Sequence, residues 1–437
     1  MTDASNTVSA LAATARRCAL DLAALPSARR ASLLRALADA LASPDNRGPL
    51  TEANEADMAD AQAAQARGEL AEALVKRLTL TDDKLSSLVD GLRQLADMPE
   101  LVGARQVHRE LDEGLVLERL SCPLGVLGVV FEARPDAVPQ ITGLALKSGN
   151  AVLLKGGSEA LRTNRALVKL IHGVLEAHGV DPGCVTLLED RAQFGALLDC
   201  HEDVDLIVAR GSGSFVSMVM ERTKIPVMGH AEGLCHLYLH ADAPAEMAAR
   251  IAVDSKCSYP AACNSIETLL WAAGAEEALD ATVLALREAG VELRGDEGTR
   301  ARHGDMAPAS DEDWATEYTA KILSIRRVDD LDAALAHIAR YGSGHTEGIV
   351  TTDAAAADRF LREVDAAGAF HNASTRFADG YRYGLGAEVG VSTQKLHARG
   401  PVGVEGLLTY RYQLRGQGQV TLDYGPGKKS YTHRDLD

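Results

Sequence analysis

The sequence predicts an α/β protein with two parallel-sheet domains and a β-ribbon arm suited to oligomerisation. Short β-rich runs alternate with helical stretches in two series, which is typical of strands that lie parallel and are covered by helices. An alternating apolar pattern around a glycine turn precedes the first series, and another alternating run lies near the C-terminus. The chain has 437 residues, of which 46% are hydrophobic, so it can bury two or three domain cores.

The N-terminal part is predicted to be helical. Apolar residues recur at helical spacing over 5–41, and a further helix is expected over 81–98, beginning at Thr81 as its cap. The pattern then changes, because residues 107–120 alternate about the turn 112–114. Such alternation predicts a β-hairpin, which we interpret as the arm.

Two α/β series follow the arm, and they set the predicted domain boundaries. We expect an N-terminal domain over 1–254, a second domain over 255–404 and a C-terminal strand and tail over 405–437. Within the tail, 406–415 alternates and can pair with the arm, either within one subunit or between two. The expected strands are 124–131, 151–154, 185–189 and 204–209, then 267–271, 321–328, 348–352 and 367–371; the expected helices are 138–146, 159–178, 275–288 and 331–338.

Charge and cysteine usage restrict the class of protein. The formal net charge is -17, which argues against a sequence-independent grip on nucleic acid or on an anionic membrane. The seven cysteines form neither a metal-binding pair nor a disulfide framework, as expected in a reducing cytoplasm. The first residues show no signal segment, and no apolar run approaches membrane-spanning length.

Cys263 is the candidate nucleophile. Pro260, Ala261 and Ala262 precede it and an apolar strand follows, so a planar carbonyl has room to approach the sulfur. The alternative is a small buried cysteine with a packing role.

A glycine turn after the strand 151–154 is the first candidate anion site. Lys155 supplies a positive charge, Gly156 and Gly157 allow close backbone approach, and Ser158 is placed to cap the next helix. A tight turn with a solvent-facing lysine is the alternative.

The strand 204–209 ends in a similar turn, with Gly211, Ser212 and Gly213, although the pattern does not match the GxGxxG fingerprint. Arg134 follows the strand 124–131, at the sheet edge where α/β proteins bind ligands. Its guanidinium suits a carboxylate or a phosphate, and a local ion pair is the alternative.

No metal site is expected. His236 and His240 share a face of one predicted strand, but they stand too far apart for one ion, so we interpret them as structural.

The order of these motifs resembles the aldehyde dehydrogenase superfamily over most of the chain. Within it, four blocks resemble the reductases that act on L-glutamyl 5-phosphate. The resemblance implies NADPH-dependent reduction of this small-molecule substrate to glutamate 5-semialdehyde with release of phosphate, the second step of proline biosynthesis from glutamate. The four blocks are 130–136, 229–236, 259–264 and 340–347.

The resemblance also implies roles for individual residues. Cys263 would carry a thioester, and its backbone N–H with Asn264 would stabilise the oxyanion. Ala133 stands where the superfamily has an asparagine donor, which leaves the second donor open. The superfamily's hydrolytic glutamate is absent, and the nearest acid, Glu232, is displaced and is a candidate for orienting the substrate amine.

For the cofactor, the resemblance assigns Lys155 to the adenosine ribose or its 2′-phosphate, Gly211 and Ser212 to the pyrophosphate, and Glu317 to the nicotinamide ribose. No acidic residue immediately follows Lys155, which favours NADPH. For the anionic groups of the substrate we expect Arg134, His345 and Arg376, because such groups need fixed positive charge in an acidic protein.

Two other functions are weighed against this one. The main rival is an NAD(P)-linked aldehyde dehydrogenase that hydrolyses its thioester. The other is a scaffold protein, or a cysteine hydrolase, that uses no nicotinamide. We expect a homo-oligomer, a dimer or larger, and the sequence leaves open an association with glutamate 5-kinase.

Overall fold

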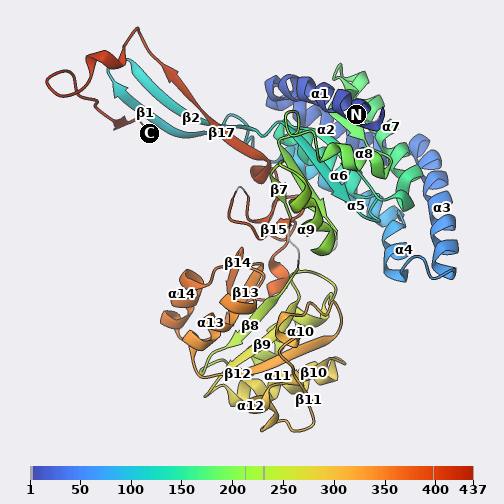
Figure 1. Ribbon diagram of the computed structural model, residues 1–437, viewed down its shortest axis with the longest axis vertical. Coiled ribbons are helices and arrows are strands. Elements are labelled where there is room, and N and C mark those ends of the chain that lie inside the picture. Colours follow the sequence, from blue (N-terminus) through green and yellow to red (C-terminus); the bar gives the residue numbers. More distant parts are fainter. Residues whose placement is uncertain (1–2, 212, 230–231, 397, 437) are drawn as a thin grey trace.

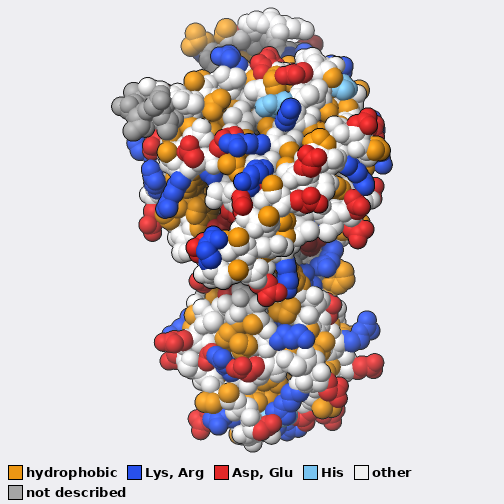
Figure 2. Space-filling view, turned by 90° about the vertical axis from the view of Figure 1, so that its right-hand side faces the viewer, with side chains coloured by type: hydrophobic (Ala, Val, Ile, Leu, Met, Phe, Trp, Pro, Cys, Tyr) orange, Lys and Arg blue, Asp and Glu red, His pale blue; other side chains and the backbone are white. Residues whose placement is uncertain are grey.

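The structure is a computed structural model that describes residues 3–211, 213–229, 232–396 and 398–436. Two lobes meet at a narrow waist, and an arm extends from the first lobe (Figure 1). The side face in Figure 2 shows the waist clearly and carries acidic and basic side chains interspersed. None of the described helices is long and apolar enough to cross a membrane.

The first lobe contains a five-stranded parallel sheet in the order β5-β4-β3-β6-β7. Every residue of the central strand β3 is buried, as expected for a strand covered by helices on both faces. The strands are β3 (Val126–Phe131), β4 (Ala151–Lys155), β5 (Val185–Leu187), β6 (Leu206–Arg210) and β7 (Val227–Met228), and the helices are α6 (Ala137–Ser148), α7 (Leu161–Ala177), α8 (Arg191–Leu197) and α9 (Gly213–Arg222).

Five N-terminal helices cover this lobe, and two of them were not predicted. Helix α3 buries only Leu50, Asn54, Asp57 and Ala61 along its whole length, so its apolar periodicity is weak. Tertiary contacts with α7 hold it in place. The helices are α1 (Asp3–Ala24), α2 (Ser27–Ala42), α3 (Pro44–Ala66), α4 (Glu72–Leu78) and α5 (Asp82–Asp97).

The second lobe contains a seven-stranded sheet in the order β11-β10-β12-β9-β8-β13-β14, and all of its pairings are parallel. The strands are β8 (Cys235–Leu239), β9 (Ile266–Ala272), β10 (Glu292–Gly295), β11 (Ala307–Pro308), β12 (Ile322–Val328), β13 (Thr346–Val350) and β14 (Gly368–His371). The helices are α10 (Ala245–Cys257), α11 (Glu276–Glu288), α12 (Glu297–Arg300), α13 (Leu331–Tyr341) and α14 (Ala354–Glu363).

The structure corrects the domain boundary expected at 254/255. Strand β8 pairs with β9 and β13, and α10 packs in the core of the second lobe, so the chain enters this lobe before Cys235. It also returns earlier than expected, because Val389 and Val402 lie in the first core. Buried strands of the two sheets have the same kind of sequence pattern, so the local sequence does not predict which sheet a strand joins. A short pair, β15 (Val391–Ser392) and β16 (Gly400–Pro401), lies in the returning segment.

The arm is a four-stranded antiparallel sheet in the order β17-β2-β1-β18. The predicted hairpin is confirmed as β1 (Arg105–Asp112) and β2 (Leu115–Pro123). Strand β17 (Leu408–Arg415) pairs with β2 of the same chain, which realises the first of the two pairings left open by the sequence. The short strand β18 (Arg434–Asp435) closes the other edge.

Candidate active site

Cys263 lies in the turn between α10 and β9, and its side chain is half-buried. The Sγ atom of Cys235 donates to the carbonyl oxygen of Cys263 at 3.2 Å. A Cβ atom on Gly233 would stand 2.3 Å from the same oxygen, so only glycine allows the chain to pass so close. The turn is therefore held by the segment that leads into β8.

His345 is the immediate neighbour of the sulfur. Its Nε2 atom lies 3.1 Å from Cys263 Sγ, and its Nδ1 atom lies 2.9 Å from Thr346 Oγ1. The ring is buried directly before β13. We expected His345 to bind an anionic group of the substrate, but the structure places it where it can exchange a proton with the thiol.

The surroundings of Cys263 keep the thiol protonated. Burial raises its pKa to about 12, with smaller contributions from Glu388 and Glu317, while Arg376 acts in the opposite direction. The thiolate is the nucleophilic form, so a proton acceptor is needed at the moment of attack. His345 contacts the sulfur and is therefore the candidate proton acceptor.

Asn264 holds a neighbouring segment. Its Nδ2 atom donates to the carbonyl oxygen of Ala378 at 2.8 Å, and its own carbonyl accepts from Thr375 Oγ1 at 2.7 Å. The side-chain donor predicted for the oxyanion is thus engaged here. Arg376 lies between Thr375 and Ala378 in the sequence, and its Nε atom donates to Ser258 Oγ at 3.1 Å.

Glu317 approaches the sulfur from a loop that is anchored by a buried ion pair. Lys256 and Glu267 are both fully buried and lie 2.6 Å apart. The Lys256 Nζ atom also lies 5.9 Å from the centre of the ring of Tyr318, the residue next to Glu317. Burial raises the pKa of Glu267 to about 7, although Lys256 opposes the shift. The pair therefore ties α10, β9 and the loop of Glu317 together.

The turn after β4 contains Lys155, Gly156, Gly157 and Ser158. Ser158 begins a short 3₁₀ helix and does not cap α7, whose N-cap residue is Ala160, so the predicted cap is wrong. A Cβ atom on Gly156 would stand 2.3 Å from Asn164 Nδ2, and one on Gly157 would stand 2.0 Å from a Glu159 carboxylate oxygen. Lys155 donates to the carbonyl of Gly156, and burial lowers its pKa. The turn thus combines a tightly packed backbone with a half-buried cation.

The second turn, after β6, is described only in part. Gly211 is exposed, and a Cβ atom there would stand 2.8 Å from the ring of Phe215. Gly213 begins α9, while the predicted contact Ser212 lies outside the described residues.

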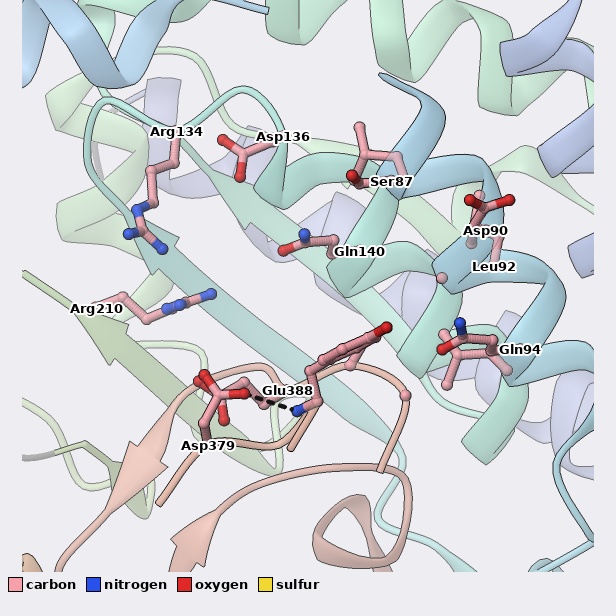
Figure 3. Close-up of a pocket in the computed structure, with 16 residues that line it drawn as sticks. Ser87, Asp90, Leu92, Gln94, Arg134, Asp136, Gln140, Arg210, Asp379 and Glu388 are labelled. Carbon is pink, nitrogen blue, oxygen red and sulfur yellow. Dashed lines mark hydrogen bonds between the residues drawn. The ribbon is translucent and has the colours of Figure 1, made fainter. Parts of the chain in front are cut away.

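Arg134 lines a cavity beside the carboxyl ends of β3 and β6 (Figure 3). Arg210 and Glu388 line it too, and neither was predicted. Arg210 ends β6 and has the same signal that identified Arg134, an arginine at the carboxyl end of a buried strand. Glu388 lies in a loop whose sequence carries no comparable signal.

The strand histidines make pairwise contacts. His236 Nδ1 lies 2.9 Å from Glu347 Oε2, and His240 Nδ1 lies 3.0 Å from the Tyr238 hydroxyl. In the described part of the chain, no group of three or more His, Cys, Asp or Glu side chains is arranged to hold a metal ion.

Comparisons with known proteins agree with this geometry. The profile of the aldehyde dehydrogenase family matches residues 2–301. The chain is 56% identical to the gamma-glutamyl phosphate reductase of Synechococcus sp. (strain JA-3-3Ab), over 97% of this chain and 93% of that protein. It is 53% identical to the protein of that name from Prochlorococcus marinus (strain MIT 9313), over 98% of this chain and 96% of that one.

A solved structure supports the same assignment. The crystal structure of gamma-glutamyl phosphate reductase from Thermotoga maritima superposes with a TM-score of 0.90, at 34% identity, over 94% of this chain and 99% of that one. The chain belongs to the gamma-glutamyl phosphate reductases of the aldehyde dehydrogenase family. The predicted family and aldehyde dehydrogenase-like fold are therefore confirmed.

The structure describes the surroundings of two positions at which the sequence departs from the superfamily pattern, Ala133 and Glu232. Ala133 adopts a φ of 39°, and its N–H donates to Glu159 Oε1 at 2.7 Å, so that backbone donor is engaged. Glu232, the displaced acid, is exposed just before β8.

Proposed function

We propose that the protein reduces L-glutamyl 5-phosphate with NADPH to L-glutamate 5-semialdehyde and phosphate, the second step of proline biosynthesis. The observation that carries the proposal is the contact of 3.1 Å between Cys263 Sγ and His345 Nε2 at the meeting of the two lobes. The names of the relatives, which match nearly the full chain, supply the substrate class. We propose the cytoplasm as its location.

In the first step, the sulfur of Cys263 attacks the acyl carbon while His345 takes the thiol proton. The bond between the acyl carbon and the phosphate oxygen breaks, and a thioester forms. The departing phosphate needs one proton to leave as hydrogen phosphate, and His345 holds the proton just taken from sulfur. The charge on Arg376 lies close enough to Cys263 to lower its pKa, so we assign Arg376 to the leaving phosphate.

The turn after β4 fits a dinucleotide. Gly156 and Gly157 allow this turn to pack tightly, since Asn164 and Glu159 take the space that a Cβ atom would need, and Lys155 adds a positive charge. The Asn164 amide, buried below Gly156, has no hydrogen-bond partner among the described residues. Lys155, Gly211 and Glu317 would hold the adenosine phosphate, the pyrophosphate and the nicotinamide ribose. NADPH, when bound, supplies the hydride that reduces the thioester.

The 2′-phosphate preference rests on Lys155. Glu159 is the nearest acid after it in sequence, but its carboxylate accepts the N–H of Ala133 and turns over Gly157. The backbone N–H of Ala133 therefore partly compensates the negative charge of Glu159. We propose that the positive charge of Lys155 binds the 2′-phosphate.

In the second step, the chain's own groups stabilise the oxyanion and release the product. The backbone N–H of Cys263 lies at the sulfur. After giving its first proton to the phosphate, His345 takes up another from solvent and passes it to the sulfur when the aldehyde leaves. The thioester must survive until it is reduced, because hydrolysis would waste the activated substrate. The exposed position of Glu232 agrees with a site that does not activate water for hydrolysis.

The reverse reaction tests the proposal. The purified protein, given glutamate 5-semialdehyde and NADP+, should form NADPH only when phosphate is present. Turnover of the aldehyde in phosphate-free buffer would instead identify a hydrolytic aldehyde dehydrogenase.

We also propose that the protein is a homo-oligomer assembled through the arm. Tyr410, Tyr412 and Leu414 alternate along the edge strand β17 and are more than half exposed, so one face of the strand presents apolar side chains. Light scattering after size exclusion should give at least twice the chain mass of 46.3 kDa, and Tyr412→Glu should lower it.

A further inference from the structure

A cavity of about 590 Å³ lies near the candidate catalytic cysteine, because its lining residue Asp379 follows Ala378, whose carbonyl oxygen accepts from Asn264 Nδ2 at 2.8 Å. Figure 3 shows that its walls come from segments far apart in the sequence. The loop after β3 and the end of β6 form one side, α5 forms another, and the returning segment 379–388 closes it. The charged residues that line it are Arg134, Arg210, Asp90, Asp136, Asp379 and Glu388.

The arginines on one side of this cavity are available to an anion. Arg210 Nη1 is buried and has no acceptor among the described residues. Arg134 lies close enough that its charge, after burial, further lowers the pKa of Arg210. Two neighbouring guanidinium groups with an unused buried donor are a binding site for a carboxylate.

The opposite side of the cavity is negative. Glu388 Oε2 accepts the backbone N–H of Gly380 at 2.8 Å, and burial raises the Glu388 pKa even though Arg210 and Arg134 oppose the shift. Asp379 lies close to Glu388 and adds to the negative potential. Bound cations such as an ammonium group would relieve this cost of burial.

The mixture of charges favours a zwitterion over a phosphate. Four carboxylates and two guanidinium groups line the cavity, so a dianionic phosphate would be repelled on balance. An α-amino acid group carries one charge of each sign and matches the two sides. The glutamyl chain also has a suitable length, because roughly 4 Å separates its acyl carbon from its α-carbon when extended.

Charged residues that line the cavity interact with the sulfur of Cys263. Glu388 makes the largest contribution of any neighbouring charge to the pKa of Cys263, and Cys263 in turn affects Arg210. A ligand whose acyl carbon is at Cys263 can therefore place its other end between Glu388 and Arg210.

We infer that this cavity binds the α-amino acid end of the substrate, with Arg134 and Arg210 on the α-carboxylate and Glu388 on the α-ammonium group. This inference rests on the proposed function. It adds how the enzyme distinguishes an acyl phosphate that carries an α-amino acid group from one that does not. Phosphate is bound elsewhere, on the side of Arg376.

The test measures kcat/KM for three aldehydes with three enzymes in the phosphate-dependent reverse reaction. The aldehydes are glutamate 5-semialdehyde, 5-oxopentanoate, which lacks the ammonium group, and 4-aminobutanal, which lacks the carboxylate. The enzymes are the wild type, Arg210→Met and Glu388→Gln. Ratios of kcat/KM between enzymes for one aldehyde cancel the fraction of that aldehyde that is cyclised.

Each variant should lose one kind of discrimination. Glu388→Gln should lower kcat/KM for glutamate 5-semialdehyde by about 10- to 100-fold but affect 5-oxopentanoate much less, because that aldehyde has no ammonium to lose. Arg210→Met should act likewise on glutamate 5-semialdehyde and much less on 4-aminobutanal. In both variants the KM for phosphate should stay within about twofold of the wild type.

Two results would overturn the inference. If Arg210→Met raised the KM for phosphate and lowered activity toward all three aldehydes equally, the cavity would be a phosphate site. If Glu388→Gln affected 5-oxopentanoate as strongly as glutamate 5-semialdehyde, Glu388 would not recognise the ammonium group. Failure of the proposed function looks different, because the wild type would then show no phosphate-dependent turnover of any aldehyde.

Matched controls separate these effects from unfolding. Arg35→Met removes an exposed arginine that pairs with Asp97, and Glu55→Gln changes an exposed acid on α3, on the outer edge of the first lobe in Figure 1. Both should behave as wild type. If Arg210→Met does not fold, Arg134→Met tests the same side of the cavity.

Discussion

The two lobes build their parts of the site in different ways. In the first lobe, the turn after β4 places Lys155, Gly156 and Gly157 together because they are consecutive in sequence. In the second lobe, Cys263 and His345 meet although 82 residues separate them. The proposed nucleotide side is therefore a local backbone structure, while the proposed catalytic side exists only when the seven-stranded sheet is assembled.

The lobes also differ in how deeply their ion pairs are buried. The second lobe buries two ionisable pairs, Lys256 with Glu267 and His236 with Glu347, near the proposed catalytic residues. Such pairs are costly to desolvate, and breaking one leaves an uncompensated charge. We therefore expect substitutions near Cys263 to affect chemistry and stability strongly, and those near Lys155 to affect mainly cofactor affinity.

The largest effect is expected at the sulfur. Cys263→Ser should lower kcat by about 10⁴-fold or more, because the hydroxyl is a far weaker nucleophile. Mass spectrometry of the wild type with substrate but without NADPH should show an acyl adduct on the peptide of Cys263, and the variant should show none. Cys122→Ser, in the arm, is the control and should be fully active. An adduct on another residue would contradict the assignment.

The next largest effect tests whether His345 is the partner base. His345→Asn should lower kcat by about 10²- to 10⁴-fold near neutral pH. Because the pKa of the Cys263 thiol is raised to about 12, the remaining activity should increase with pH across the accessible range. His371→Asn, an exposed histidine on β14, should leave the pH profile unchanged. A variant that keeps the wild-type profile would show that the proton leaves by another route.

The third prediction concerns the buried ion pair. Lys256→Met should lower the free energy of unfolding by about 3–5 kcal/mol, because Glu267 is left buried without its partner. Urea denaturation measures this, and adding Glu267→Leu should restore most of the loss. Equal stability of the single variant would mean that the pair is not buried in solution.

The same pair has a defined pH dependence. Glu267 has a pKa raised to about 7, so its contribution to stability is present below its unfolded pKa and is lost as pH rises through about 7. Without Lys256 that pKa should rise further. The deficit of Lys256→Met should therefore be larger at about pH 8 than at about pH 6.

The smallest effect is expected on the nucleotide side. Lys155→Met should raise the KM for NADPH by about tenfold, with little change in kcat and a weaker effect on NADH, because one charge-assisted contact to the 2′-phosphate is lost. Lys169→Met, an exposed lysine on α7, is the control. A large fall in kcat would show that the two sides are less separable than the comparison suggests.

Local pattern was enough for most of the fold. Helical periodicity predicted α2 and α5, alternation predicted the arm, and the runs of apolar residues predicted β3, β4, β9 and β12 close to their observed bounds. Helix α3 was missed because it buries few apolar residues. The boundary was misplaced because β8 is buried on both faces, as a strand of either sheet would be.

The sequence by itself identified the candidate groups that lie within one local turn: the proposed nucleophile in its small-residue turn, the glycine turn with its lysine, and the arginine that follows a strand. Only the tertiary structure decided that His345 contacts the sulfur, that Asn264 is engaged by Ala378, and that Glu388 faces Arg210. The physical reason is that hydrogen bonds and charge interactions act over a few ångströms in space. The order of residues along the chain fixes those distances only within a turn.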